Sequence, residues 1–368
     1  MSPSGVAAFV LSPPAVHNPP IKKSATIRKA RPRLSASAKP GPQTDVRLGR
    51  IVRLLANHAT VVVSGTKIAS EIGTSRSEVW RLVQQLRDLG VNIGGHPATG
   101  YSLTSMPDLL LPDLVAPLLH GTIFAKNIHH YYKIGSTNNV AMDAAGAEAP
   151  EGSVFLAEQQ TAGRGRGANQ WQSARSAGIY CSVVLRPQLL PSDVLVLSLA
   201  AGLAVHAAIQ DIDPRVKPDL KWPNDLLIDG KKFCGILTEM NAEVTRVRHV
   251  VVGVGINANQ ESFPTDLKGL ATSLRLVTGT EWSRVELCAA LLKSLDREYR
   301  ELMQNTNARE SILTRFSQRS SSLQGARVLV DQNGGFEGVT EGLDSRGFLQ
   351  VRTATGLRTV LSGTVRKP

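Results

Sequence analysis

Residues 161–171 read TAGRGRGANQW and carry two arginines separated by a single glycine. Three glycines within five residues let the backbone approach a ligand closely, at an entropic cost when the loop is ordered. Arg164 and Arg166 are permanently charged and match phosphate or carboxylate groups, and Trp171 offers a large apolar face for stacking. The pattern predicts a loop that closes on an anionic ligand. A solvated, arginine-rich surface loop is an equally open alternative from spacing alone.

The KWPND segment, residues 221–225, shifts that balance towards function. Pro223 fixes the backbone after a strand and prevents further ladder pairing, and Asn224 and Asp225 can lock the turn through their side chains. A rigid turn at a strand end holds Lys221 in a set position, where α/β proteins form ligand crevices. A lysine point charge suits a carboxylate that is becoming a mixed anhydride with phosphate. An ordinary surface lysine before a turn is the alternative.

Two glycine-containing segments add polar groups with weaker signals. GSTNN, residues 135–139, precedes a helical pattern, so Ser136 or Thr137 can cap that helix or hold a polar headgroup at its N-terminus. GVGIN, residues 253–257, has the spacing G-x-G-x-N and no following helix with a third glycine, so its likeness to a dinucleotide fingerprint is superficial. The sequence has no P-loop, HExxH motif or paired His/Cys spacing, and no metal ligand of protein origin is assigned.

Hydrophobic periodicity predicts the elements that position these groups. We expect an α/β (α+β) catalytic domain over residues 106–320, with a mixed sheet and long helices at 191–212 and 281–303. The apolar run 194–209 is too short and too interrupted to span a bilayer, so it predicts a buried core helix and no membrane contact. Residues 321–368 are short strands and turns, typical of a small SH3-like β-barrel.

Residues 45–105 predict a winged helix-turn-helix domain that binds DNA. SGTKIASEIG and SRSEVWRLVQQLRDLG read as capped helices ended by glycine, and a Gly-rich hairpin follows. The second helix of this motif enters the major groove, where Arg and Gln read base edges. A small helical domain for protein contacts is the alternative. The candidate DNA-binding residues are Arg76, Arg81, Gln84 and Gln85.

The net charge of +12 is concentrated at the N-terminal end of the chain. Residues 1–44 hold seven Lys/Arg and no acid, and residues 46–105 hold seven basic and three acidic residues, whereas the remainder is nearly balanced. A basic small domain indicates a nucleic-acid partner, and an anion site in the near-neutral remainder must be local. We expect residues 1–44 to be a disordered basic tail, with a start codon assigned too early or a transit peptide as alternatives. Three widely spaced cysteines favour a reducing compartment, the cytoplasm.

Taken in order, GSTNN, AEQQTAGRGRGANQW, KWPNDLLIDGKKFCGILTE and VVGVGIN resemble the biotin protein ligases, and the resemblance covers residues 46–368. The N-terminal domain is similar to that of the bifunctional group, which also represses biotin synthesis genes, and the central domain resembles the class II aminoacyl-tRNA synthetase/biotin ligase type. The resemblance implies that biotin and ATP form biotinyl-5′-AMP with Mg²⁺, and that biotin then passes to a lysine of the biotin carboxyl carrier protein of acetyl-CoA carboxylase. It also implies operator DNA as a partner and, because two half-sites need two reading heads, a homodimer.

The resemblance further implies roles for single residues. Arg164 pairs with the carboxylate or phosphate, Arg166 orders the loop and retains the intermediate, and Lys221 lies at the carboxylate–phosphate junction; these three are the catalytic candidates. Trp171 stacks near adenine, and Asn257 and Arg166 contact the nucleotide. The implied biotin-binding residues are Ser136, Thr137, Asn138, Gln160, Arg164, Gly165, Arg166 and Lys221.

Two other functions remain open, and one feature departs from the family pattern. A biotin-sensing repressor with secondary ligase activity fits the N-terminal domain, and a lipoate ligase or octanoyltransferase fits a related fold, although GRGRxxxxW with KWPND argues against the latter. After Arg166 the family often continues with basic residues, whereas GANQ is neutral here. We expect this to loosen the hold on the intermediate.

Overall fold

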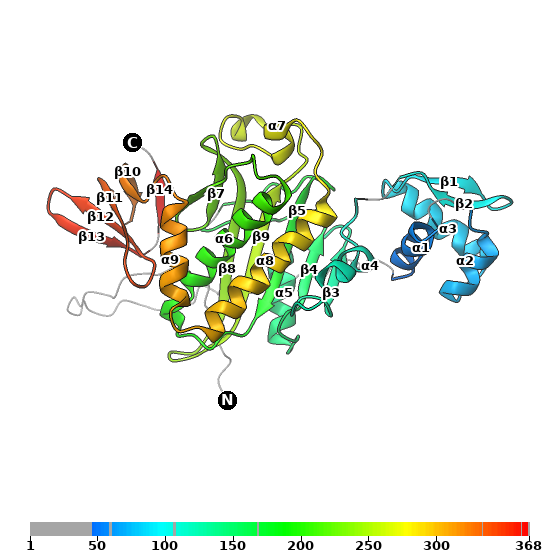
Figure 1. Ribbon diagram of the computed structural model, residues 1–368, viewed down its shortest axis with the longest axis horizontal. Helices are drawn as coiled ribbons and strands as arrows, with labels where there is room; N and C mark the ends of the chain where they lie inside the picture. Colours follow the sequence, from blue (N-terminus) through cyan, green and yellow to red (C-terminus); the bar gives the residue numbers. More distant parts are fainter. Residues whose placement is uncertain are drawn as a thin grey trace, which may run out of the picture.

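The computed structural model describes residues 46–366 apart from 59–60, 106–107, 168, 333 and 362. Three bodies lie in a row, with the N-terminal domain at one end, a large sheet-and-helix domain in the middle and a small β domain at the other end (Figure 1). The tail predicted over residues 1–44 lies outside the described residues.

The N-terminal body is the predicted winged helix-turn-helix. Its elements are α1 (Val46–Ala56), α2 (Gly65–Ile72), α3 (Arg76–Asp88), β1 (Ile93–His96) and β2 (Gly100–Leu103). Ser64 and Ser75 cap α2 and α3 by accepting hydrogen bonds from the amides of Lys67 and Glu78. Gly73 ends α2 at φ 66°, in the left-handed region that glycine favours. The apolar faces of the three helices meet in one core.

A seven-stranded mixed sheet forms the central domain, in the order β3-β4-β5-β9-β8-β7-β6. Only the β3–β4 pair is parallel among the pairings of this sheet in the described residues. The strands are β3 (Ile128–Tyr131), β4 (Val154–Ala157), β5 (Gly178–Leu185), β6 (Asp219–Lys221), β7 (Asp225–Ile228), β8 (Lys231–Ala242) and β9 (Val247–Asn257).

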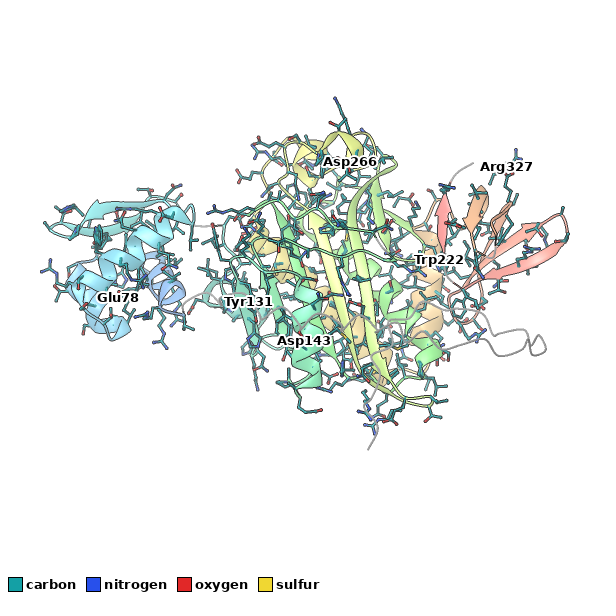
Figure 2. The ribbon with its side chains drawn as sticks, turned by 180° about the vertical axis from the view of Figure 1, so that it is seen from behind. Glu78, Tyr131, Asp143, Trp222, Asp266 and Arg327 are labelled. Carbon is teal, nitrogen blue, oxygen red and sulfur yellow. The ribbon has the colours of Figure 1, made fainter. Side chains whose placement is uncertain are left out.

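Helices cover the two faces of this sheet unequally. The long helices α6 (Leu195–Ile212) and α8 (Arg284–Gln304) lie across one face (Figure 1), and α5 (Thr137–Gly146) lies on the other (Figure 2). Strand alternation assigns side chains to the two faces: Val250, Val252 and Val254 of β9 belong to the main core, whereas Val251 joins the smaller core under α5. The remaining helical elements are α4 (Pro112–Val115), η1 (Ala116–Leu119), η2 (Pro191–Asp193), η3 (Thr265–Leu267), α7 (Leu274–Thr278) and α9 (Ala308–Gln318).

Helix α6 is the buried core helix that the sequence predicts. Within the described part of the chain, the segment Pro191–Ile212 is the one helix with the length and composition to cross a bilayer, and 78% of its most apolar window is buried. It packs against α8, α9 and the sheet, so its apolar surface is used inside the protein.

The C-terminal body is an antiparallel five-stranded sheet, which agrees with the predicted small all-β domain. Its order is β13-β12-β11-β10-β14, and the strands are β10 (Gln324–Asp331), β11 (Phe336–Leu343), β12 (Leu349–Thr353), β13 (Gly356–Val360) and β14 (Thr364–Arg366). The Trp222 indole, labelled in Figure 2, donates a hydrogen bond of 2.9 Å to the Gly347 carbonyl and so ties this domain to the central one.

Helix α8 begins three residues later than the sequence predicts. Ser283 accepts a hydrogen bond from the Glu286 amide at 3.2 Å and so caps the helix, which starts at Arg284 instead of Glu281. Helices α7 and α9 are short and lie between stronger patterns, and periodicity did not predict them.

Candidate active site

One cleft of about 720 Å³ brings together residues from distant parts of the sequence. It opens on the α5 side of the central sheet and reaches the C-terminal domain, whose Asp331 and Gly363 help to line it. All the residues predicted to bind biotin or nucleotide line this cleft: Ser136, Thr137, Asn138, Gln160, Arg164, Gly165, Arg166, Trp171, Lys221 and Asn257.

Glycines at alternate positions of β8 and β9 make room for the cleft. Gly235 pairs with Gly255, and Leu237 pairs with Gly253, so these residues lie on the α5 face while their valine and isoleucine neighbours face the core. A Cβ at Gly255 would lie 2.5 Å from the Trp171 indole, and a Cβ at Gly253 would overlap the Asn138 side chain. GVGIN is therefore part of a strand whose glycines form the floor of the cleft.

The predicted headgroup residues form a connected hydrogen-bond network at one end of the cleft. Gln160 Oε1 accepts from the Thr137 amide (2.8 Å) and hydroxyl (3.1 Å). The Ser182 hydroxyl of β5 donates its proton to Asn138 Oδ1 at 2.6 Å, and its oxygen lies 2.8 Å from the Thr137 hydroxyl. Ser136 occupies the N-cap position of α5 but makes no capping bond, so a helix-capping role does not account for its hydroxyl. Fixed donors and acceptors of this kind suit a ureido ring.

Trp171 lies at the other end of the floor. Its ring packs over Gly235 and Gly255, and the Lys232 Nζ lies 5.5 Å from the ring centroid, a cation–π arrangement. Lys232 also pairs with Asp225 Oδ1 at 2.6 Å. A flat apolar ring beside a lysine suits an adenine and its phosphates. Lys232 was not predicted as a site residue, although it lies in β8, seven residues after KWPND.

The two loop arginines extend in different directions. Arg164 forms an ion pair with Glu239 of β8, whereas Arg166 Nη1 donates to the Gly363 carbonyl of the C-terminal domain at 3.5 Å. Burial lowers the pKa of Arg166, and the carboxylate of Asp225 partly opposes that shift. The loop itself is closed by a hydrogen bond of 2.8 Å from the Gly165 amide to the Asn169 carbonyl. The loop thus directs Arg164 towards Glu239 of β8 and Arg166 towards the C-terminal domain.

Lys221 is held at the end of β6 by the turn that follows it. The Trp222–Pro223 peptide is cis, the Asn224 amide donates to the Lys221 carbonyl at 3.2 Å, and the Asn224 side chain donates to the Ile236 carbonyl at 2.9 Å. Lys221 and Arg164 line the same cleft. Asn257 is 5% exposed, and its amide is held by the Thr272 carbonyl and by Gln260, so it presents a fixed edge to the cleft.

The predicted DNA-reading residues lie on α3, away from this cleft. Arg76 donates to the Pro97 carbonyl, in the turn between β1 and β2, at 3.0 Å. Arg81 forms a bidentate interaction with the Glu78 carboxylate at 2.7 and 2.8 Å. Gln84 and Gln85 are only partly exposed. Trp80, which sequence reasoning did not select, is 48% exposed on the same helix. The signal in the sequence was a tryptophan within the helix predicted to enter the major groove.

Comparisons with known proteins agree with this arrangement. Models of an HTH domain, of the "Biotin/lipoate A/B protein ligase family" and of the "Biotin protein ligase C terminal domain" match residues 47–102, 131–257 and 325–367, respectively. The "Bifunctional ligase/repressor BirA" of Bacillus spizizenii is 34% identical over 86% of this chain and 97% of its own length.

The chain belongs to the biotin protein ligase family.

Other members of the biotin protein ligase family are also similar to this chain in sequence or in structure. The Escherichia coli bifunctional ligase/repressor is 28% identical over 82% of this chain and 90% of its own length. The biotin protein ligase from Aquifex aeolicus, solved in complex with biotin and ATP, superposes with a TM-score of 0.58 at 28% identity, over 66% of this chain and 100% of that chain. The predicted family, fold class and bifunctional domain composition are confirmed, whereas the roles of the single cleft residues remain predictions.

Proposed function

We propose that this protein activates biotin with ATP to give biotinyl-5′-AMP and pyrophosphate, and then transfers biotin to a specific lysine of a biotin carboxyl carrier protein. A carboxylate oxygen of biotin attacks the α-phosphorus and displaces pyrophosphate. In the second step the carrier lysine attacks the acyl carbon, and AMP leaves with the electrons of the C–O bond. The observation that carries the proposal is the single cleft in which a headgroup network, two loop arginines, Lys221 and Trp171 meet.

The chain's own residues would contribute binding, positioning and electrostatic stabilisation. Gln160, Thr137 and Asn138 hold the headgroup, and Trp171 with Asn257 holds the adenine. Lys221 and Arg166 stabilise the negative charge that develops on the phosphate, where preorganised cations act most strongly. Closure of the Arg164–Gln170 hairpin over the cleft excludes water, which would hydrolyse the mixed anhydride.

A magnesium ion fits this cleft as a companion of the nucleotide. Mg²⁺ is usually held by one or two carboxylates together with substrate phosphates, and the cleft supplies the carboxylates of Asp225 and Asp331. Asp225 is already paired with Lys232, so the donor set suits an ion that arrives with ATP. When bound, the ion would neutralise phosphate charge.

The same chain would act on DNA as a homodimer and work in the cytoplasm. The winged helix-turn-helix presents α3, and two copies match the two half-sites of an operator. All three cysteines, Cys181, Cys234 and Cys288, are free and buried, which suits a reducing compartment. The Bacillus relative is named as both a ligase and a repressor.

The decisive experiment is biotin-dependent exchange of labelled pyrophosphate into ATP, followed by transfer to a carrier domain. Exchange with biotin, and none with lipoate or octanoate, supports the ligase assignment. DNA binding measured with and without biotin plus ATP tests the repressor activity in the same preparation. Ligand-dependent DNA binding without exchange would leave a biotin-sensing repressor as the better description.

A further inference from the structure

The carboxylate of Glu239 joins the headgroup network to the arginine loop. Glu239 Oε2 accepts a hydrogen bond from Asn138 Nδ2 at 3.0 Å, and Glu239 Oε1 pairs with Arg164. Its side chain is 14% exposed. Glu239 is the last residue of the KWPNDLLIDGKKFCGILTE segment, but the resemblance implies no role for it, and the proposed mechanism does not use it.

Strand alternation explains why this carboxylate lies beside the cleft. Gly235, Leu237 and Glu239 occupy every second position of β8 and therefore share the face of the sheet that carries the cleft floor. Gly235 lies beneath Trp171, whereas Glu239 is four residues further along the strand, about 13 Å away at the rise of a β-strand. Glu239 thus belongs to the headgroup end and lies far from the nucleotide end.

The bond from Asn138 to Glu239 fixes the orientation of the Asn138 amide. Asn138 Oδ1 accepts from the Ser182 hydroxyl, and Asn138 Nδ2 donates both to Glu239 and to the Leu237 carbonyl. A flipped amide would place Oδ1 against two groups that only accept, the Leu237 carbonyl and the Glu239 carboxylate, so the carboxylate helps to select one orientation. The headgroup therefore meets a predetermined pattern of donor and acceptor.

The ion pair with Glu239 gives Arg164 a fixed endpoint beside the headgroup pocket. Arg164 lies on a glycine-flanked loop, whose conformational freedom opposes any single position of a long side chain. The Glu239 side chain is 14% exposed and that of Arg164 is 42% exposed, so the attraction is screened less than between two fully exposed groups. The loop residue nearest the headgroup is thereby tied to the floor of the cleft.

We propose that Glu239 is a positioning residue for biotin, which acts through Asn138 and Arg164 to preorganise the headgroup end of the cleft. The inference rests on the proposed ligase function and adds to it a residue that governs biotin affinity. Because Glu239 lies far from Trp171 and Gly235, its loss should change biotin binding more than the chemical step. In a competing role, Glu239 would compete with the biotin carboxylate for Arg164. Loss of the Glu239 charge would then make biotin bind more tightly.

The test compares Glu239→Gln with Glu239→Ala and with the control Glu243→Gln. The glutamine can still accept from Asn138 but loses the charge that pairs with Arg164, whereas alanine loses both contacts. Glu243 pairs with Arg248 at the exposed turn after β8 and lies outside the cleft. Biotin dissociation constants come from calorimetry, and KM for biotin and kcat come from pyrophosphate exchange.

For Glu239→Gln we expect about tenfold weaker biotin binding, a similar rise in KM for biotin, a kcat within about threefold of wild type, and faster tryptic cleavage after Arg164. Glu239→Ala should bind biotin more weakly still, and Glu243→Gln should match wild type. Adding Glu239→Gln to Arg164→Ala should weaken binding by less than the two single effects together. Unchanged or tighter biotin binding by Glu239→Gln, or fully additive effects with Arg164→Ala, would overturn the inference. Absence of exchange in the wild type would instead reject the ligase function itself.

Discussion

At the scale of single residues, Lys221 is a cation whose position is fixed by the turn that follows it. Its backbone carbonyl is bonded by the Asn224 amide, and its side chain lines the cleft. A fixed cation stabilises a developing phosphate charge without reorganisation at the moment of reaction. Lys221 is also partly exposed, so its removal creates no buried cavity.

We therefore expect Lys221→Ala to reduce biotin-dependent pyrophosphate exchange by at least about 100-fold, a typical effect of removing one preorganised charge-stabilising group. The melting temperature should stay within about 2 °C of wild type because little packing is lost. Lys217→Ala is the matched control, since that lysine bonds the Pro214 carbonyl in the exposed loop before β6. Full exchange activity in Lys221→Ala would refute the catalytic role.

The environment of Glu158 determines how its ionisation affects the stability of the protein at low pH. The side chain is fully buried and accepts from the Leu110 amide, Ser176 and Arg284, and it bonds the His130 ring at 3.0 Å. Burial alone would raise the pKa of Glu158, but the His130 hydrogen bond, the charge of Arg284 and the Leu110 amide together hold it at about 2, against an ordinary 4.5. The folded state therefore favours the ionised carboxylate.

Because the folded-state pKa of Glu158 is depressed, its stabilising effect is complete above about pH 4.5 and is lost as the pH falls towards 2. This group should contribute about 3 kcal/mol to the free energy of unfolding over that window. Glu158→Gln should be less stable at pH 6 and should show a flatter dependence between pH 4.5 and 2, measured by urea unfolding. Parallel pH profiles for the two proteins would contradict the assignment.

At the scale of elements, β8 and β9 show what the sequence could predict and what it could not. The sequence predicted a mixed sheet in this domain, and residue type selected Lys221, Arg164 and Arg166, because charges and rigid turns are local features. The pairing of Gly235 with Gly255 is a long-range register, so the floor they form beneath Trp171 could not be read from either segment alone. Glu239 was missed for the same reason: its partners Asn138 and Arg164 lie on other elements.

Helix α3 shows a different limit of sequence reasoning. Arg81 is a suitable base-reading residue by type, but its guanidinium is bound to Glu78, whose carboxylate also pairs with Arg47 at 3.3 Å. The arginine would have to exchange these bonds for a base. Trp80 on the same helix exposes apolar surface, and apolar side chains in the major groove contact thymine methyl groups.

Trp80→Ala should therefore weaken specific DNA binding by about tenfold or more, by loss of apolar contact area. The melting temperature should fall little, because the side chain is 48% exposed. Fluorescence anisotropy with DNA selected by the wild type from a random pool provides the measurement. Val46→Ala removes apolar surface from α1, where Val46 is 66% exposed, and should leave DNA binding unchanged. Equal loss in both variants would show a general effect on the domain.

At the scale of the whole molecule, buried charges connect the N-terminal domain to the catalytic one. Arg284 of α8 is completely buried and bonds Asp108 and Glu158 at 2.8 Å each, and the Leu110 amide bonds the same Glu158. Asp108 and Leu110 belong to the segment that leads out of the winged helix-turn-helix. Removing one partner from such a buried ionic network usually costs about 3–5 kcal/mol, so this segment is anchored firmly at its catalytic end.

A second connection runs from the cleft to helix α3. The Gln160 side chain donates to Ser173, two residues before Arg175, and Arg175 Nη2 donates to the Asp88 carbonyl at the end of α3 at 2.8 Å. The Arg175 guanidinium also lies 4.7 Å from the centre of the Tyr132 ring. The segment that follows Trp171 thus touches both the headgroup network and the end of α3.

Arg175→Ala should reduce the effect of bound adenylate on DNA affinity by about fivefold, the size expected from one exposed charge-assisted hydrogen bond that couples two sites. Biotin-dependent exchange should remain within about twofold of wild type, because Arg175 does not line the cleft. The measurement is DNA binding with and without biotin plus ATP, and Arg248→Ala, which removes an exposed arginine paired with Glu243, is the control. Since coupling between two binding sites is reciprocal, DNA should also tighten adenylate binding less in Arg175→Ala. If ligand changes DNA affinity equally in the variant and the wild type, Arg175 does not couple the two sites.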